Sequence, residues 1–239
     1  MGGLYYDFHI HSCLSPCGDE DMTPANIAGM AFLNGLQAIA LTDHNTTGNC
    51  AALKKAAEQY GLTVLFGMEL TTAEEVHTVC LFPDAETAGE WEEYVRARLI
   101  KLENNPDIFG RQLFMDAEDH ILGEEPYLLI NATEIAFEDV FEPVERLGGV
   151  AFPAHVDKNA NSLISNLGFV PPDSRFQTAE ISRPDGTEQL MLAHPYFKEC
   201  RMLTDSDAHY LPDIGRAVYK IEPDDPSPAG IIRYLRGQG

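Results

Sequence analysis

The chain has 239 residues, of which 44% are hydrophobic and 23% are charged, a composition typical of a folded globular protein and not of a disordered one. Its Lys and Arg residues number 16 and its Asp and Glu residues number 38, so the formal net charge is −22. Such a charge repels the phosphate backbone of a long nucleic acid, and binding of a long nucleic acid in a basic groove is therefore not expected.

No membrane or targeting signal is apparent in the sequence. The first residues contain neither a basic segment nor a signal-like apolar run, and no segment approaches the ~18 consecutive apolar residues of a membrane span. The five cysteines are an odd number scattered along the chain, which fits a reducing compartment. We therefore expect a cytoplasmic protein that does not contact a membrane, while the oligomeric state leaves no trace in the sequence.

Strand-like and helix-like segments alternate along the chain, which predicts βα units around a parallel sheet in one α/β domain spanning residues 1–239. Strands are predicted at residues 4–9, 37–42, 62–66, 75–82, 149–153, 178–182 and 201–204. Helices are predicted at residues 24–34, 45–60, 85–102 and 135–147, and a last short helix within 224–239. Residues 103–130 lose this periodicity and are interpreted as a small insertion, with short strand candidates at 112–115 and 120–122.

Histidines carry most of the functional information in this sequence. Six of the eight lie near ends of predicted strands and beside carboxylates: His9, His11, His44, His77, His155 and His209. Alternate residues of a strand point to the same face, so His9 and His11 present two imidazoles side by side. His120 and His194 lack carboxylate neighbours in a matching motif and are not expected to bind metal.

If the strands form a barrel, their C-terminal ends meet at one mouth and bring these histidines together with two or three carboxylates. Imidazole and carboxylate groups bind zinc, manganese and iron, and about nine such donors exceed the needs of one ion. The sequence therefore predicts two or three divalent metal ions at one site.

The order and spacing of these motifs resemble those of the PHP (polymerase and histidinol phosphatase) domain family of metal-dependent phosphoesterases. The resemblance covers nearly the whole chain and rests on Asp7-Phe8-His9-Ile10-His11-Ser12, Thr42-Asp43-His44, Gly67-Met68-Glu69, His77, His155 and Asp207-Ala208-His209. It implies a distorted seven-stranded (β/α) barrel, similar to a TIM barrel, that holds three metals at its mouth.

The resemblance also implies a ligand set for each ion. One ion would be held by His9, His11, Glu69 and Asp207, and a second by Glu69, His77 and His155. The third would use His44 and His209. The sequence departs from many relatives in the loop after the first motif, where they place His or Asp, and here Cys17 or Asp19 could take that place.

Three further residues are candidates for catalysis or phosphate binding. Asp43 follows the second strand and is interpreted as an acceptor that orients an imidazole, with general-base catalysis as the alternative. Arg183 and, after it, Lys158 are candidates for binding a phosphate oxygen, and each could instead be a plain surface charge.

Clustered metals activate water as hydroxide and stabilise a leaving oxygen, which predicts hydrolysis of a small-molecule phosphomonoester. The first alternative is a phosphodiesterase or nuclease acting on short oligonucleotides or nucleoside bisphosphates. The second is a non-catalytic metal-binding module. Neither the substrate nor the native metal can be read from the sequence.

Overall fold

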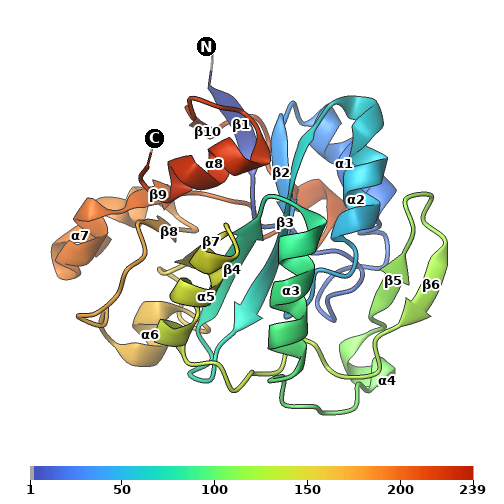
Figure 1. Ribbon diagram of the computed structural model, residues 1–239, viewed down its shortest axis with the longest axis horizontal. Coiled ribbons are helices and arrows are strands. Elements are labelled where there is room, and N and C mark those ends of the chain that lie inside the picture. Colours follow the sequence, from blue (N-terminus) through green and yellow to red (C-terminus); the bar gives the residue numbers. More distant parts are fainter. Residues whose placement is uncertain (1–2, 239) are drawn as a thin grey trace.

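The computed structural model describes residues 3–238, which form helices packed against a curled central sheet (Figure 1). The strands are β1 Leu4–Asp7, β2 Ala38–Leu41, β3 Thr63–Thr71, β4 His77–Phe82, β5 Leu113–Met115, β6 Ile121–Glu124, β7 Val150–Pro153, β8 Thr178–Glu180, β9 Arg201–Leu203 and β10 Lys220–Ile221. The α-helices are α1 Pro24–Leu33, α2 Cys50–Ala57, α3 Ala85–Arg96, α4 Pro106–Phe109, α5 Phe141–Arg146, α6 Leu163–Leu167, α7 Thr187–Ala193 and α8 Pro228–Leu235.

The main sheet has six strands in the order β10-β1-β2-β3-β4-β7. Strands β1, β2 and β3 are parallel, whereas β10 is antiparallel to β1 and β4 is antiparallel to both of its neighbours. The prediction of an α/β domain is confirmed, but the sheet is mixed and not parallel throughout.

The seven-stranded barrel is confirmed only in part, because the continuous hydrogen-bonded ladder is a six-stranded half-barrel. Strands β8 and β9 form a separate parallel pair. Backbone hydrogen bonds at and beyond the ends of these strands connect the pair to the main sheet: the Val156 N–H donates to the Glu180 carbonyl, and the His11 N–H donates to the Ala208 carbonyl, each at 2.9 Å.

The departure from a parallel sheet begins at the β3–β4 hairpin. The two strands pair in register from Phe66 opposite Phe82 to Thr71 opposite His77. The chain reverses between them through a short turn in which Glu75 has φ of 58°. As a result, the N-terminal end of β4 lies at the same edge of the sheet as the C-terminal ends of β1, β2 and β3.

The helices begin where the sequence predicts, or later, and they are shorter than predicted, most clearly α2, α3 and α5. Helix α1 begins at Pro24 with the Thr23 side chain accepting from the Asn26 N–H, as its capping pattern indicates. Helix α2 begins only at Cys50 because the preceding segment folds as a loop, with Asn45 at φ of 53°. Helix α3 ends at Arg96 because the chain beyond it pairs with residues 126–134 as extended backbone.

Other segments were not predicted as they occur. The predicted helix 135–147 is a 3₁₀ turn followed by the short α5, and α4, α6, α7 and β10 have no counterpart among the predicted elements. The expected insertion contains α4 and the β5–β6 hairpin. In Figure 1 this hairpin lies at the right-hand side of the molecule, and α7 lies at the left-hand side.

Two apolar clusters cover the two faces of the sheet. One lies on the inner face and joins β1, β2, β3, β4 and β7 to three residues of α8: Ile231, Ile232 and Leu235. The other lies beneath α1, α2, α3 and α5. Strand alternation decides the face, since Leu65 belongs to the inner cluster whereas Phe66 and Met68 belong to the outer one.

Within the described residues, the helices are all too short or too polar to cross a lipid bilayer.

Candidate metal centre

The edge of the sheet where β1, β2 and β3 end and β4 begins carries a dense group of histidine and carboxylate side chains. They follow or belong to six strands: His9 and His11 after β1, His44 after β2, Glu69 in β3, His77 in β4, His155 after β7, and Asp207 and His209 after β9. Glu69 lies on the inner face of the sheet, as Leu65 of the inner cluster does, because the two are an even number of residues apart in β3. For the same reason His77 shares this face with Val79 and Leu81 of β4. A cavity of about 240 Å³ opens over them.

Glu69 lies at the centre of this group, with its carboxylate surrounded by five imidazoles. One oxygen, Oε1, is 2.8 Å from His77 Nδ1, 3.1 Å from His155 Nε2 and 3.3 Å from His9 Nε2. The other, Oε2, is 3.3 Å from His11 Nε2 and 3.2 Å from His44 Nδ1.

The pKa of Glu69 is lowered well below its ordinary value. Burial raises it, but the attraction of His77, His9 and His44 outweighs burial. Conversely, burial opposes the charging of His9, yet the carboxylates of Glu180, Glu69 and Asp207 raise its pKa well above that of an ordinary histidine. The cluster therefore keeps its carboxylates charged and attracts cations.

The donor atoms form three overlapping sets, and within each set all atoms lie within 4.8 Å of one another. They are His9, His11, Glu69 and Asp207; His44, Glu69 and His77; and His11, Cys17, His44 and His209. Two donor atoms that bind the same ion at ~2.0–2.2 Å lie ~3.0–3.5 Å from each other. The nitrogens and oxygens around Glu69 have similar separations.

Buried polar atoms support the same interpretation. The Nδ1 atoms of His44 and His77 face Glu69, but neither has a hydrogen-bond partner among residues 3–238. Buried polar groups in folded proteins are normally paired, and a bound cation would satisfy these nitrogens. The donor set therefore fits divalent metal ions.

Residues outside the cluster fix the orientation of three imidazoles. The Nδ1 atom of His9 is 2.7 Å from Glu180 Oε2, and that of His11 is 3.0 Å from Ser15 Oγ. The Nδ1 atom of His209 is 2.7 Å from the Asp207 carbonyl oxygen. With Nδ1 engaged in this way, Nε2 of each ring is left for the cluster.

Asp43 is fully buried and contacts no imidazole directly. Its carboxylate accepts from the Ser12 N–H at 2.7 Å, the Ser12 hydroxyl at 2.6 Å and the Ser15 hydroxyl at 2.7 Å. Through Ser15 it positions His11, which supports the predicted orienting role. Asp43 does not line the cavity, so the geometry offers no support for the general-base alternative.

Glu180 was not identified from the sequence. It is the last residue of β8, is fully buried, and makes the closest carboxylate contact of His9. A carboxylate at the end of an apolar strand was the available signal, but Glu180 follows no histidine and belongs to none of the quoted motifs.

The two predicted phosphate-binding cations lie in different places. Lys158 lines the metal cavity, and its ammonium group forms an ion pair with Asp207. Arg183 is largely exposed, and its Nε atom lies 3.8 Å from Asp157 Oδ2. It lines a neighbouring cavity of about 540 Å³ that Lys158 also borders. The structure therefore does not bring Arg183 into the metal cavity.

Of the two histidines not expected to bind metal, His120 lies on the surface beside Asp116, 3.0 Å from its Oδ2. His194 lines the neighbouring cavity and not the metal cavity. Both are outside the three donor sets.

Backbone strain is concentrated at this edge. His155 has φ of 29° and Asp207 has φ of 50°, a region that side-chain-bearing residues seldom occupy. Each such conformation costs on the order of 1–3 kcal/mol and persists where the surroundings impose it, often at functional sites. Here the strain sets two candidate ligands at the cavity.

A curled α/β sheet with overlapping imidazole and carboxylate donor sets at one edge is typical of a metal-binding domain. Residues 7–157 match the family model of the PHP domain, and residues 198–238 match that of the PHP-associated segment. The chain belongs to the PHP domain family. This membership confirms the resemblance seen in the sequence, and with it the class of metal-dependent phosphoesterases.

Among curated proteins, the chain is 34% identical over 76 residues to the uncharacterized protein MJ1587 of Methanocaldococcus jannaschii, a match covering 28% of this chain and 44% of that protein. It is 32% identical over 67 residues to a 5'-3' exoribonuclease of Haemophilus influenzae, covering 28% of this chain and 23% of that protein. The chain thus spans less than half the length of either relative.

Among solved structures, the lesion-specific endonuclease PfuEndoQ of Pyrococcus furiosus matches with a TM-score of 0.67 and 18% identity, over 100% of this chain and 57% of that one. Endonuclease Q has also been solved with a 27-mer duplex substrate that carries an abasic lesion at its active site. At this identity the likeness establishes the fold.

Proposed function

We propose that this chain hydrolyses a small-molecule phosphomonoester at the cavity above Glu69. The observation that carries the proposal is the convergence of six imidazoles, two carboxylates and a thiol on one site, with Glu69 shared between donor sets. Divalent ions bound there would polarise a phosphoryl oxygen and lower the pKa of a water molecule, which is the chemistry that hydrolysis of a phosphate ester needs.

The first donor set and the contacts of Glu69 suggest how the ions are divided. We assign one ion to His9, His11, Glu69 and Asp207. We assign a second to Glu69, His77 and His155, because His77 Nδ1 and His155 Nε2 both approach Glu69 Oε1. His44 lies close to both Glu69 and His209, and we assign it with His209 to a third ion. Zinc, manganese and iron all accept such donors at the first two positions.

The chain's own residues would bind and orient the substrate. Lys158 borders both cavities, so its ammonium group can bind a phosphoryl oxygen once the Asp207 carboxylate holds a cation. Asp43 holds His11 in place through Ser15. Arg183 would act on the remainder of the substrate, because it lines the neighbouring cavity.

The sizes of the cavities favour a small substrate. The metal cavity, at about 240 Å³, lies below the ~300–1,000 Å³ range of most ligand pockets and suits a phosphoryl group. The neighbouring cavity, at about 540 Å³, suits a small organic group. The net charge of −22 disfavours a long nucleic acid.

A phosphodiesterase or nuclease is the second candidate function. One curated relative is an exoribonuclease, and a protein of similar fold is an endonuclease solved with a duplex substrate that carries an abasic lesion. A short oligonucleotide or a nucleoside bisphosphate needs little basic surface, and the two adjoining cavities could hold it.

We also propose that the protein is cytoplasmic, as the sequence predicts.

The test is phosphate release from a panel of phosphomonoesters, phosphodiesters and short oligonucleotides by protein loaded separately with manganese, zinc or iron. We expect monoester turnover that falls at least 100-fold in His9→Ala. The matched control is His120→Ala, which removes an exposed imidazole remote from the cavity and should leave turnover unchanged. Cleavage of diesters alone would establish the second candidate, and no cleavage of any ester would overturn both.

A further inference from the structure

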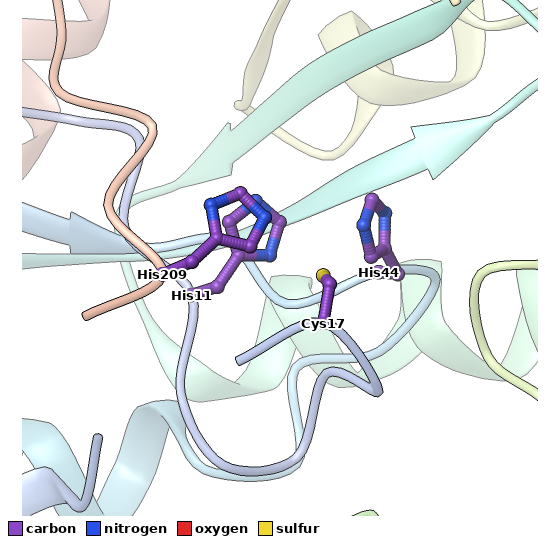
Figure 2. Close-up of side chains that lie close together, drawn as sticks. All are labelled: His11, Cys17, His44 and His209. Atoms are coloured by element: carbon purple, nitrogen blue, oxygen red, sulfur yellow. The ribbon is translucent and has the colours of Figure 1, made fainter. Parts of the chain in front are cut away.

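The loop that joins β1 to α1 is anchored on both sides of Cys17. Two residues before it, the Ser15 hydroxyl donates to Asp43 and contacts His11. Two residues after it, the Asp19 N–H donates to the His209 carbonyl at 2.9 Å. The chain between these two residues is therefore fixed beside the metal site. Figure 2 shows the Cys17 sulfur between His44 on one side and His11 and His209 on the other.

Gly18 makes this tight approach possible. A Cβ atom at this position would lie 2.2 Å from the Ser12 carbonyl oxygen, closer than any contact that side chains tolerate. The loop therefore requires glycine directly after Cys17, and this close packing fixes the backbone that carries Cys17.

The alternative donor from the same loop, Asp19, is turned away. Its Oδ1 accepts from the Asp21 N–H at 2.9 Å, and Asp19 belongs to none of the three donor sets. By contrast, Cys17 shares a set with His11, His44 and His209, whose donor atoms all lie within 4.8 Å.

Within this set, His11 is already committed elsewhere. Its Nε2 lies 3.3 Å from both Glu69 Oε2 and Asp207 Oδ1, in the first donor set. Cys17 and His209 belong to this set alone, whereas His44 also belongs to the set with Glu69 and His77. Cys17, His44 and His209 all line the cavity. His44 is 2% exposed, and its Nδ1 has no hydrogen-bond partner in the described part of the chain.

We propose that Cys17, as a thiolate, completes a third metal site with His44 and His209, and that this site selects zinc. The inference deepens the proposed function and rests on it. One sulfur and two imidazole nitrogens would supply three of the four ligands that zinc usually takes. The other two sites contain carboxylate and imidazole only, so manganese competes well there, whereas a thiolate favours zinc.

Cobalt(II) reports on this site directly, because a thiolate bound to cobalt gives an intense near-ultraviolet charge-transfer band that imidazole and carboxylate do not give. Protein loaded with three equivalents of cobalt should show the band. Cys17→Ser should lose it and bind one ion fewer, by elemental analysis of the dialysed protein. Cys17→Asp, which restores a charged ligand, should recover the third ion without the band.

The matched control is Cys200→Ser, which removes a half-buried thiol outside the three donor sets and should keep both the band and the third ion. Circular dichroism checks the fold of each variant. X-ray absorption at the zinc edge needs no variant: the wild-type protein should show a sulfur scatterer at about 2.3 Å.

A wild-type cobalt protein without the band, or a band that survives Cys17→Ser, would overturn the assignment. So would a zinc-edge spectrum without sulfur. None of these readouts depends on ester hydrolysis. The proposed thiolate site can therefore be refuted while the phosphatase proposal is supported, and the phosphatase proposal can be refuted while the thiolate site is supported.

Discussion

At the scale of single residues, the site is organised around the shared carboxylate of Glu69 and around groups that orient the imidazoles. Glu69 is 1% exposed, and histidines from four different chain segments approach it within 3.3 Å. A buried carboxylate without cations or protonated imidazoles around it would be strongly disfavoured. The residues that surround Glu69 therefore matter for folding as well as for metal binding.

Glu180 is expected to tune the affinity of the first metal site through His9. Replacing a carboxylate that supports a ligating imidazole typically costs 10–100-fold in metal affinity. We expect Glu180→Gln to weaken metal binding by about this factor, in a competition titration against a chromophoric chelator. Glu90→Gln removes an exposed carboxylate on α3 and should leave the affinity unchanged. Equal affinities of the two variants would contradict the role of Glu180.

The metal-free protein is expected to lose stability as pH rises. Burial opposes charging of His11, but hydrogen bonds with Asp207 and Glu69 raise its pKa to about 9. A pKa raised in the folded state stabilises the fold fully below the unfolded value of ~6.5, and this stability is lost as pH rises toward the folded value. His9 shifts in the same direction.

Urea unfolding of chelated protein should therefore give a free energy of unfolding that is roughly 1–2 kcal/mol lower at pH 8 than at pH 6.5. With saturating metal, the ligand imidazoles no longer hold these protons, and the decrease should disappear. A metal-free protein that is equally stable at both pH values would show that the imidazoles are not protonated together with the carboxylates.

At the scale of elements, the β3–β4 hairpin places the central residues of the site. Gly67 lies two residues before Glu69 on the same face of β3, where the sheet leaves no room for a side chain. A Cβ atom there would lie 2.8 Å from Leu81 Cδ2 and 3.0 Å from the Leu41 carbonyl oxygen. Because one of these neighbours is backbone, it cannot move aside cheaply.

Gly67→Ala should therefore destabilise the protein by about 1–3 kcal/mol, measured by urea unfolding, and should weaken metal binding because Glu69 is displaced. Gly89 in α3 is the matched control, since a Cβ atom there meets nothing within 4 Å. Gly89→Ala should stabilise the protein by about 0.5–1 kcal/mol, the usual gain in a helix. Destabilisation by both would contradict the packing argument.

At the scale of the whole molecule, the metal site lies at one edge of a fold that has its own apolar core. Both faces of the main sheet are covered by buried hydrophobic side chains, and neither apolar cluster includes a candidate metal ligand. The fold should therefore persist without metal, in contrast to small domains in which the metal supplies the folding energy.

We expect chelated protein to retain its circular dichroism spectrum and to melt cooperatively at a lower temperature than metal-loaded protein. Each ion at 100 times its Kd stabilises the folded state by about 2.7 kcal/mol. Asp207→Asn should stay folded, bind fewer ions and gain less stability from metal. Unfolding upon chelation would instead identify the ions as structural.

Several features of this protein are determined by its local sequence. The strands β1, β2 and β7, the cap of α1 and the family motifs follow from apolar runs, capping residues and short-range spacing. The order of His9, His11, Glu69 and Asp207 along the chain predicted one shared site because strand ends gather at an edge. The tertiary structure brings their donor atoms within 4.8 Å.

Other features were decided only by tertiary structure. The direction of β4 depends on a turn centred on a residue with positive φ, and helix α3 ends where distant backbone competes for its hydrogen bonds. Glu180 contacts His9 across 171 positions of the chain, and the direction in which a loop turns places Cys17, and not Asp19, beside the histidines. Local propensity carries no information on such long-range contacts, because they are selected by the packing of the whole chain.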